Sequence, residues 1–306
     1  MKKKDWIIRN WLHKLPSNWW IQISRYQVSV GTGSFIRKEL VFLHLSDLQS
    51  QWFGKNQRNL LKVVEGLCKK ENPSFAVFTG DLIDRRFTDY QAGKSLIEGL
   101  GEKLKCYYVN GNHEVLLGKE CESFVNEFKG RVYNLSGKVS LEEDGIILAG
   151  VDERWVYEAR GFDRRGDAFD EAGLCKKIDE MLGSVYKSGA VCKEKKAMIE
   201  GDLNGPVVLL SHEPQLISIY SSIPCQLVLS GHGHGGQVRL PLVGGLYAPE
   251  QGVLPKYTEG LHSFGGCKLI VNRGLGNSRF PLRIFNRPEI GVVHLTVYGE
   301  TDTVKL

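Results

Sequence analysis

The chain has 306 residues, of which 42% are hydrophobic, so it is long enough to bury one large core. Its 40 basic and 35 acidic residues give a net charge of +5 and are mostly interspersed, which argues against a protein with a strongly basic, nucleic-acid-binding surface. Its seven cysteines include no Cys-x-x-Cys pair, which fits neither a disulfide framework nor a structural zinc site.

Residues 1–25 form an amphipathic segment rich in Trp and Lys, which contains four of the six tryptophans. If residues 5–15 are helical, one broad face carries the apolar side chains Trp6, Ile7, Ile8, Trp11, Leu12 and Leu15. Such a helix is typical of one that lies in a membrane interface, and residues 1–20 would make this contact. The alternative is a helix packed against protein. Without a membrane-spanning run or a secretory signal, we expect a cytoplasmic protein, peripheral on the inner face of the membrane if the first interpretation holds.

From Leu40 onward, short apolar runs alternate with helical patterns. The expected strands are Leu40–Leu45, Phe75–Thr79, Cys106–Val109, Ile146–Ala149, Val207–Leu210 and Leu227–Leu229. Between the first two, apolar residues repeat at helical spacing from Leu60 to Cys68, and Pro73 follows the predicted helix. The alternation predicts a layered α/β domain, with residues 26–306 as a single domain.

Two later regions depart from this alternation. Residues 156–205 are charged and poorly periodic apart from Leu174, Ile178 and Leu182, which predicts a helical insertion. After residue 236 the apolar segments, such as 268–271 and 291–297, are short and broken by Gly and Pro. These segments predict a second, mostly antiparallel sheet.

Polar clusters follow the predicted strands. They are His44–Gln49, Gly80–Asp84, Gly111–Glu114, Ser211–His212 and Gly231–Gln237. If the strands share one sheet, these clusters meet at its carboxyl edge, where α/β folds bind ligands. Carboxylates combined with at least three imidazoles are ligands for Mn, Fe, Zn or Ni, whereas an all-oxygen set would favour Ca or Mg. The sequence therefore predicts a transition-metal site.

The order of these clusters resembles the calcineurin-like metallophosphoesterase pattern D-x-H, G-D-x-x-D, G-N-H-D/E, H, G-H-x-H, across about residues 26–297. The flanking stretches 235–237, 274–278 and 286–289 further resemble a bacterial branch with YkuE- and YaeI-like phosphodiesterases and some UDP-2,3-diacylglucosamine pyrophosphatases. The resemblance implies a four-layer α/β/β/α sandwich of two mixed sheets flanked by helices. It also implies hydrolysis of a phosphodiester or pyrophosphate bond by a hydroxide that bridges two divalent metals, with Mn favoured over Fe, Zn or Ni. A membrane-associated or nucleotide-sugar lipid is one substrate class that this branch suggests.

The same resemblance assigns roles to individual residues. One metal would be held by Asp47, Gln49, Asp81 and His234, and the other by Asp81, Asn112, His212 and His232. His113 would be the acid that protonates the leaving oxygen, with Asp84 and Glu114 orienting imidazoles around it. Gln49 departs from the pattern, which has histidine there, and its carboxamide is a poorer ligand than imidazole. We therefore expect the first metal to bind less tightly than the second.

Two other functions compete with this interpretation. A metal-binding scaffold with weakened catalysis would explain Gln49, and a nuclease is disfavoured because the chain lacks a basic stripe with interleaved aromatic residues. The candidates for substrate phosphate binding are Arg85, Arg86, Arg273 and Asn277.

Overall fold

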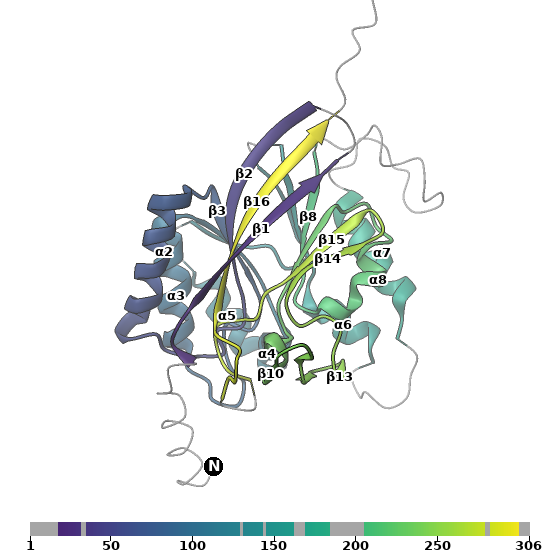
Figure 1. The fold of residues 1–306 in the computed structure, drawn as a ribbon. Coiled ribbons are helices and arrows are strands. Elements are labelled where there is room, and N and C mark those ends of the chain that lie inside the picture. The colour runs from purple at the N-terminus through teal and green to yellow at the C-terminus, as the bar shows by residue number, and fades with distance from the viewer. Residues whose placement is uncertain are drawn as a thin grey trace, which may run out of the picture.

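The computed structural model describes residues 18–31, 35–128, 131–142, 145–161, 169–183, 205–278 and 282–299, which form two six-stranded mixed sheets packed face to face (Figure 1). The first sheet has the order β1 (Gln22–Val30), β16 (Glu289–Gly299), β2 (Phe35–Leu45), β3 (Phe75–Thr79), β4 (Lys105–Val109) and β5 (Val132–Asn134). The second has the order β14 (Gly260–Phe264), β15 (Cys267–Val271), β9 (Leu227–Ser230), β8 (Val207–Leu210), β7 (Ile147–Gly150) and β6 (Lys138–Leu141).

Helices cover the outer face of each sheet and complete four layers (Figure 1). On the first sheet lie α2 (Arg58–Glu71), α3 (Tyr90–Lys103), α4 (Asn112–Leu117) and α5 (Lys119–Asn126). On the second lie α6 (Glu153–Ala159), α7 (Glu171–Gly183) and α8 (Ile217–Tyr220). Short elements occur in the connections: η2 (Lys55–Gln57), η3 (Pro214–Leu216), η4 (His234–Gly236), β10 (Arg239–Leu240), β11 (Gly244–Gly245), β12 (Tyr247–Ala248) and β13 (Gly252–Val253). The expected α/β/β/α sandwich is confirmed.

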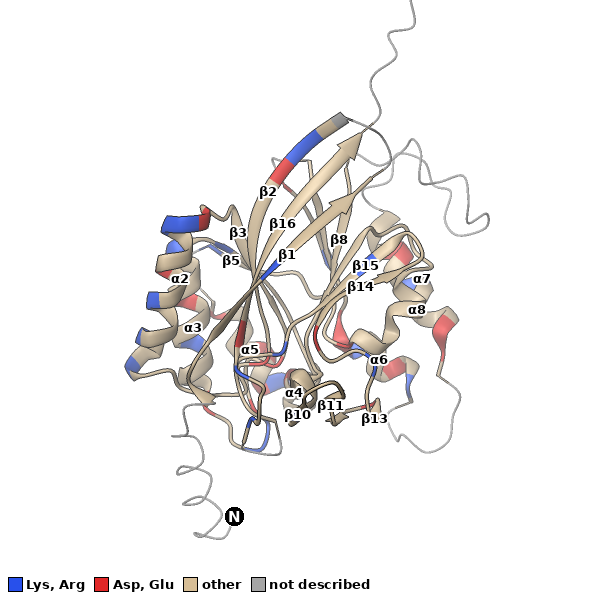
Figure 2. Ribbon diagram, in the orientation of Figure 1, with Lys and Arg blue, Asp and Glu red and all other residues tan. Residues whose placement is uncertain are grey.

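Strand β3 shows why the central runs are continuously apolar. Its alternate side chains Phe75 and Val77 enter the core between the sheets, whereas Ala76 and Phe78 enter the core under α2 and α3. A strand covered on both faces loses the alternation of apolar and polar residues. Outside these cores, Lys and Arg residues mark the solvent-facing surface of α2 (Figure 2).

The expectation of a second, mostly antiparallel sheet after residue 236 is wrong, because the strands of this region divide between the two mixed sheets. Strand β15 pairs parallel to β9 in the second sheet, and β16 inserts between β1 and β2 in the first. The residue pattern identifies both segments as strands, but it does not specify which neighbours they bind, because pairing is decided by tertiary packing.

The described residues account for part of two other expectations. Leu174, Ile178 and Leu182 lie on α7 and pack into the core under the second sheet, while 162–168 and 184–204 lie outside the described residues. The predicted helix over residues 5–15 also lies outside them, and residues 22–25 begin strand β1. Among the described helices, none combines the length and apolar character needed to cross a membrane.

Candidate metal centre

The strand ends at one edge of the paired sheets carry the predicted site residues. Asp47 and Gln49 follow β2, Asp81 follows β3, Asn112 follows β4, His212 follows β8, and His232 and His234 follow β9. Five of the seven have left-handed backbone: Asp47 (φ 51°), Gln49 (φ 52°), Asp81 (φ 56°), His232 (φ 65°) and His234 (φ 44°). Non-glycine residues seldom adopt this conformation, and such strain concentrates at functional sites.

Glycines allow these loops to approach one another. Gly80 has φ +87°, and a Cβ there would lie 2.6 Å from Nδ1 of His212. A Cβ on Gly231 would lie 2.3 Å from Oδ2 of Asp47. Both positions therefore need glycine for space, and Gly80 needs it also for its left-handed backbone.

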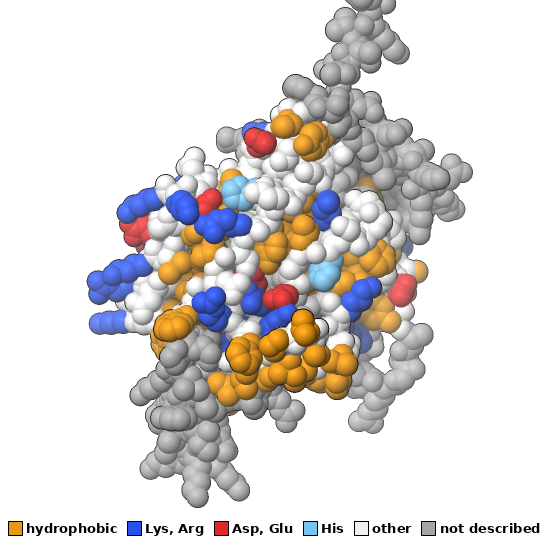
Figure 3. Space-filling view, in the orientation of Figure 1, with side chains coloured by type: hydrophobic (Ala, Val, Ile, Leu, Met, Phe, Trp, Pro, Cys, Tyr) orange, Lys and Arg blue, Asp and Glu red, His pale blue; other side chains and the backbone are white. Residues whose placement is uncertain are grey.

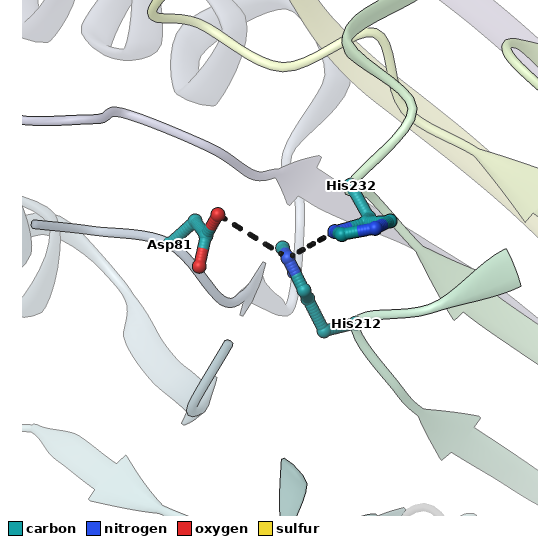
Figure 4. A group of neighbouring side chains, drawn as sticks. All are labelled: Asp81, His212 and His232. Carbon is teal, nitrogen blue, oxygen red and sulfur yellow. Dashed lines mark hydrogen bonds and ion pairs between the residues drawn. The ribbon is translucent and has the colours of Figure 1, made fainter. Parts of the chain in front are cut away.

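Asp81, Asn112, His212 and His232 form a first cluster, which we call the bis-histidine cluster. Nδ1 of His212 lies 2.8 Å from the carbonyl oxygen of Thr79, to which it donates. Its Nε2 therefore presents a lone pair in neutral imidazole, 3.1 Å from Oδ1 of Asn112 and 3.4 Å from Oδ2 of Asp81. Nδ1 of His232 lies 3.1 Å from Nε2 of His212 (Figure 4) and also 3.1 Å from Oδ1 of Asn112. Imidazole, amide and carboxylate atoms that converge in this way are typical of a site for a divalent cation.

The charge balance of the bis-histidine cluster leads to the same requirement. Burial by itself would lower the pKa of His212, but the charges of Asp81 and Asp47 hold it well above its usual value. Burial and the neighbouring His212 lower the pKa of His232 to about 4. The two imidazoles are therefore not both protonated, and together with the Asp81 carboxylate they form a donor set that suits a divalent ion.

Asp47, Gln49, Asp81 and His234 form a second group, the Asp47 cluster. Ligand atoms of Asp47, Asp81 and His234 all lie within 4.8 Å of one another, and Nε2 of His234 is 3.4 Å from Oδ1 of Asp47. Gln49 is buried here, its Nε2 donates to Oδ2 of Asp81 at 2.6 Å, and its Oε1 has no hydrogen-bond partner among the described residues. Asp81 is thus common to both clusters.

His113 lies beside the two clusters and is slightly exposed. Its Nδ1 accepts a hydrogen bond from the backbone N–H of Arg85 at 3.1 Å, so neutral imidazole carries its proton on Nε2. That atom lies 3.9 Å from Oδ2 of Asp81, which aims the proton at the clusters. Asp84 lies 3.6 Å from Nδ1, beyond hydrogen-bond distance, and accepts from Arg86, so its orienting role stays a prediction.

The position of Glu114 changes the role expected for it. Its carboxylate accepts from the backbone N–H groups of Asp81 (2.9 Å), Ile83 (2.9 Å) and Gly111 (2.8 Å). It therefore holds the loops after β3 and β4 against each other and positions Asp81, rather than orienting an imidazole. Burial and the charge of Asp81 raise the pKa of Glu114 to about 7.

The fold places Arg283, Asn286 and Arg273 around the site. Arg283 is buried and donates to the carbonyl oxygens of Arg273 and Gly276. Asn286 donates to the carbonyl oxygen of His234 at 2.7 Å. Arg273 is buried in ion pairs with Glu259 and Glu289, whereas Arg85 and Arg86 are exposed. No sequence pattern indicated Arg283, whereas Asn286 lies in the stretch 286–289 that resembles the bacterial branch.

Comparison with known proteins identifies the group to which this centre belongs. A model described as calcineurin-like phosphoesterase matches residues 40–236, which include every residue of both clusters. The chain belongs to this family. It is therefore a hydrolase that acts on phosphoester bonds, and the family binds divalent metals, for which the two clusters are the candidate sites.

Three curated relatives within the calcineurin-like phosphoesterase family agree with the bacterial branch. The metallophosphoesterase YkuE of Bacillus subtilis is 29% identical over 77% of this chain and 72% of its own length. The phosphodiesterase YaeI of Escherichia coli is 24% identical over 90% of this chain and 88% of its own. The UDP-2,3-diacylglucosamine pyrophosphatase LpxG of Chlamydia muridarum is 36% identical, but over only 32% of each chain.

Proposed function

We propose that this calcineurin-like phosphoesterase hydrolyses a phosphodiester or pyrophosphate bond with two divalent metal ions, Mn first among them. The supporting observation is the sharing of Asp81 between two buried clusters. Asp81, Asn112, His212 and His232 would hold one metal, and Asp47, Asp81 and His234 with Gln49 would hold the other. When bound, such a pair supplies positive charge that acidifies water and stabilises phosphoryl oxygens.

The residues around the clusters supply the remaining functions. Glu114 fixes the backbone of Asp81, and Thr79 sets the tautomer of His212 so that Nε2 faces the ligand position. As imidazolium, His113 would donate its Nε2 proton to the leaving oxygen and return to neutral imidazole with the other proton left on Nδ1. The nearby carboxylate of Asp84, 3.6 Å from Nδ1, would stabilise the positive charge of that imidazolium.

Hydrolysis of bis-p-nitrophenyl phosphate during a Mn titration tests this function. We expect no turnover of the chelated protein and recovery of turnover as Mn is added. A protein that binds Mn but does not cleave this ester at saturating metal would instead be the catalytically weakened scaffold that Gln49 suggests.

For the natural substrate, we favour a phosphoester that is lipid-linked, on an enzyme that sits in the cytoplasm at the inner face of the membrane. The support is the partial similarity to LpxG and the Trp- and Lys-rich sequence of residues 1–20. Comparing turnover of a UDP-linked diacylated sugar with that of its deacylated form tests the lipid requirement. Equal kcat/KM for both would contradict it.

A further inference from the structure

Exposed apolar side chains gather on the turns around β10–β13 and on the neighbouring residue Phe285 (Figure 3). We call this surface the apolar rim, and its members are Leu240, Leu242, Val243, Val253, Leu254 and Phe285. Leu242 is fully exposed, and Phe285 and Leu254 are 75% and 62% exposed. Scattered exposed apolar residues are common, but a contiguous group indicates a binding surface.

The turns of the rim are physically continuous. Leu242 and Phe285 line one groove together. In the neighbouring turns, Tyr247 on β12 pairs with Val253 on β13. The backbone N–H of Leu254 donates to the carbonyl oxygen of Leu246 at 3.0 Å, which holds these turns together. The rim is therefore one surface.

The backbone at three of these tips is unusual. Leu242 (φ 67°), Leu254 (φ 53°) and Phe285 (φ 49°) are all left-handed, a conformation that favours Gly or Asn and is costly for bulky side chains. Asparagine would make the same turns with less strain. The apolar side chains thus do not serve the turns, which points to a role outside the folded chain.

The rim is attached directly to the metal centre. Leu246 N donates to the carbonyl oxygen of Gly236, beside the ligand turn, at 3.2 Å. Asn286, next to Phe285, donates to the carbonyl oxygen of His234. Whatever covers the rim therefore lies next to the loop that carries two candidate metal ligands.

The chemistry of the surroundings favours a lipid bilayer as the occupant. The stretch 240–254, which carries five of the six rim members, has Glu250 as its one charged residue, whereas Lys256 and Arg287 at its borders are exposed and complement anionic headgroups. Phe285 also shares a groove with Trp20, which is 66% exposed. Trp20 connects the rim to the Trp- and Lys-rich sequence of residues 1–17.

From these observations we infer that the apolar rim is a second membrane-docking element, which seats the metal centre against the headgroup layer of an anionic bilayer. This inference goes beyond the proposed hydrolysis, because it concerns binding and stands without it.

Sedimentation of the full chain with vesicles made of equal parts phosphatidylglycerol and phosphatidylcholine tests the inference. The test variant is Leu242→Asn/Leu254→Asn/Phe285→Asn, whose asparagines suit left-handed backbone, so that folding is retained. The control variant is Ile36→Asn/Leu141→Asn, which removes two exposed apolar residues from strand ends opposite the metal edge. Turnover of bis-p-nitrophenyl phosphate is measured for each.

We expect the rim variant to partition at least about tenfold more weakly than the native chain. The control should bind like the native chain, and all three should cleave the soluble ester equally. Equal vesicle binding by the rim variant, or an equal loss in the control, would overturn the inference. So would a native chain that ignores vesicles but self-associates through the rim in sedimentation velocity, which would identify a second copy as the occupant. Absent hydrolysis with intact vesicle binding would contradict only the proposed function.

Discussion

Gln49 donates from Nε2 to Oδ2 of Asp81 at 2.6 Å, and this carboxylate oxygen also lies 3.4 Å from Nε2 of His212. A neutral amide thus stands where the family pattern has an imidazole. Half a turn of the amide would exchange its nitrogen for Oε1, a weak neutral ligand. In either orientation the Asp47 cluster has one imidazole, His234, where the bis-histidine cluster has two, so the two metal positions differ in their ligands.

We expect activity of the native chain to rise in two steps as Mn is added, and Gln49→His to shift the second step to a Mn concentration about tenfold lower or more. Imidazole restores a stronger ligand at the Asp47 cluster. Gln49→Met, similar in size but without the amide, should not gain this affinity. An unchanged titration of a folded Gln49→His variant would place Gln49 outside the ligand set.

Asp81→Asn should remove both metals, because both clusters use this carboxylate. Losing several kcal/mol of charge stabilisation corresponds to a fall in kcat of about 10³ or more. Metal content after gel filtration is the direct measurement. The control Asp89→Asn alters a carboxylate that caps α3, which should leave both metals bound. Two metals on Asp81→Asn would contradict the shared ligand.

His113→Ala should retain both metals and lower turnover by about 10² or more for esters with poor leaving groups. Esters of p-nitrophenol leave without protonation and should be affected much less. A series of leaving groups of rising pKa measures the difference, with His262→Ala on β14 as the control. Equal losses across the series would show that His113 does not donate the proton.

The burial of His44 predicts that the folded protein loses stability as the pH falls. It is fully buried on β2, with Nε2 3.0 Å from Oγ1 of Thr79, and burial lowers its pKa from 6.5 to about 4. As the pH falls from 6.5 to 4, the unfolded chain gains this proton before the folded chain does. The free energy of unfolding therefore loses about 3 kcal/mol over that range.

Urea denaturation between pH 7 and pH 4, in chelator throughout, measures this loss for His44→Gln against the native chain. The variant should lack the His44 contribution, while the control His294→Gln on β16 should retain it. Identical pH dependence of the native chain and His44→Gln would contradict the assignment.

Deletion of residues 1–17 should weaken binding to anionic vesicles and leave hydrolysis of a soluble ester unchanged. The deletion ends before Asn18, whose Oδ1 accepts from the backbone of Arg283, and before Trp19, which packs edge-on against Phe53. Vesicle sedimentation checks the first expectation and ester turnover the second. Equal vesicle binding by both chains would favour a segment that packs on protein.

The sequence by itself determined the local elements and the chemistry of the centre. The apolar runs at Phe75–Thr79 and Val207–Leu210 match β3 and β8, because strands buried on both faces need such runs. The candidate ligands could also be predicted from the sequence. The residue type fixes which atoms can bind a metal, and the glycines beside these residues indicate the loops that carry them.

Tertiary structure decided what depends on distant neighbours. It inserted β16 between β1 and β2, because strand pairing is selected by the surfaces that meet rather than by the strand alone. It placed the Glu114 carboxylate where it accepts hydrogen bonds from three backbone N–H groups, which converge only after β3 and β4 pair. It also gathered Leu242, Leu254 and Phe285 beside the metal edge, because exposure is a property of the folded surface and not of the residue.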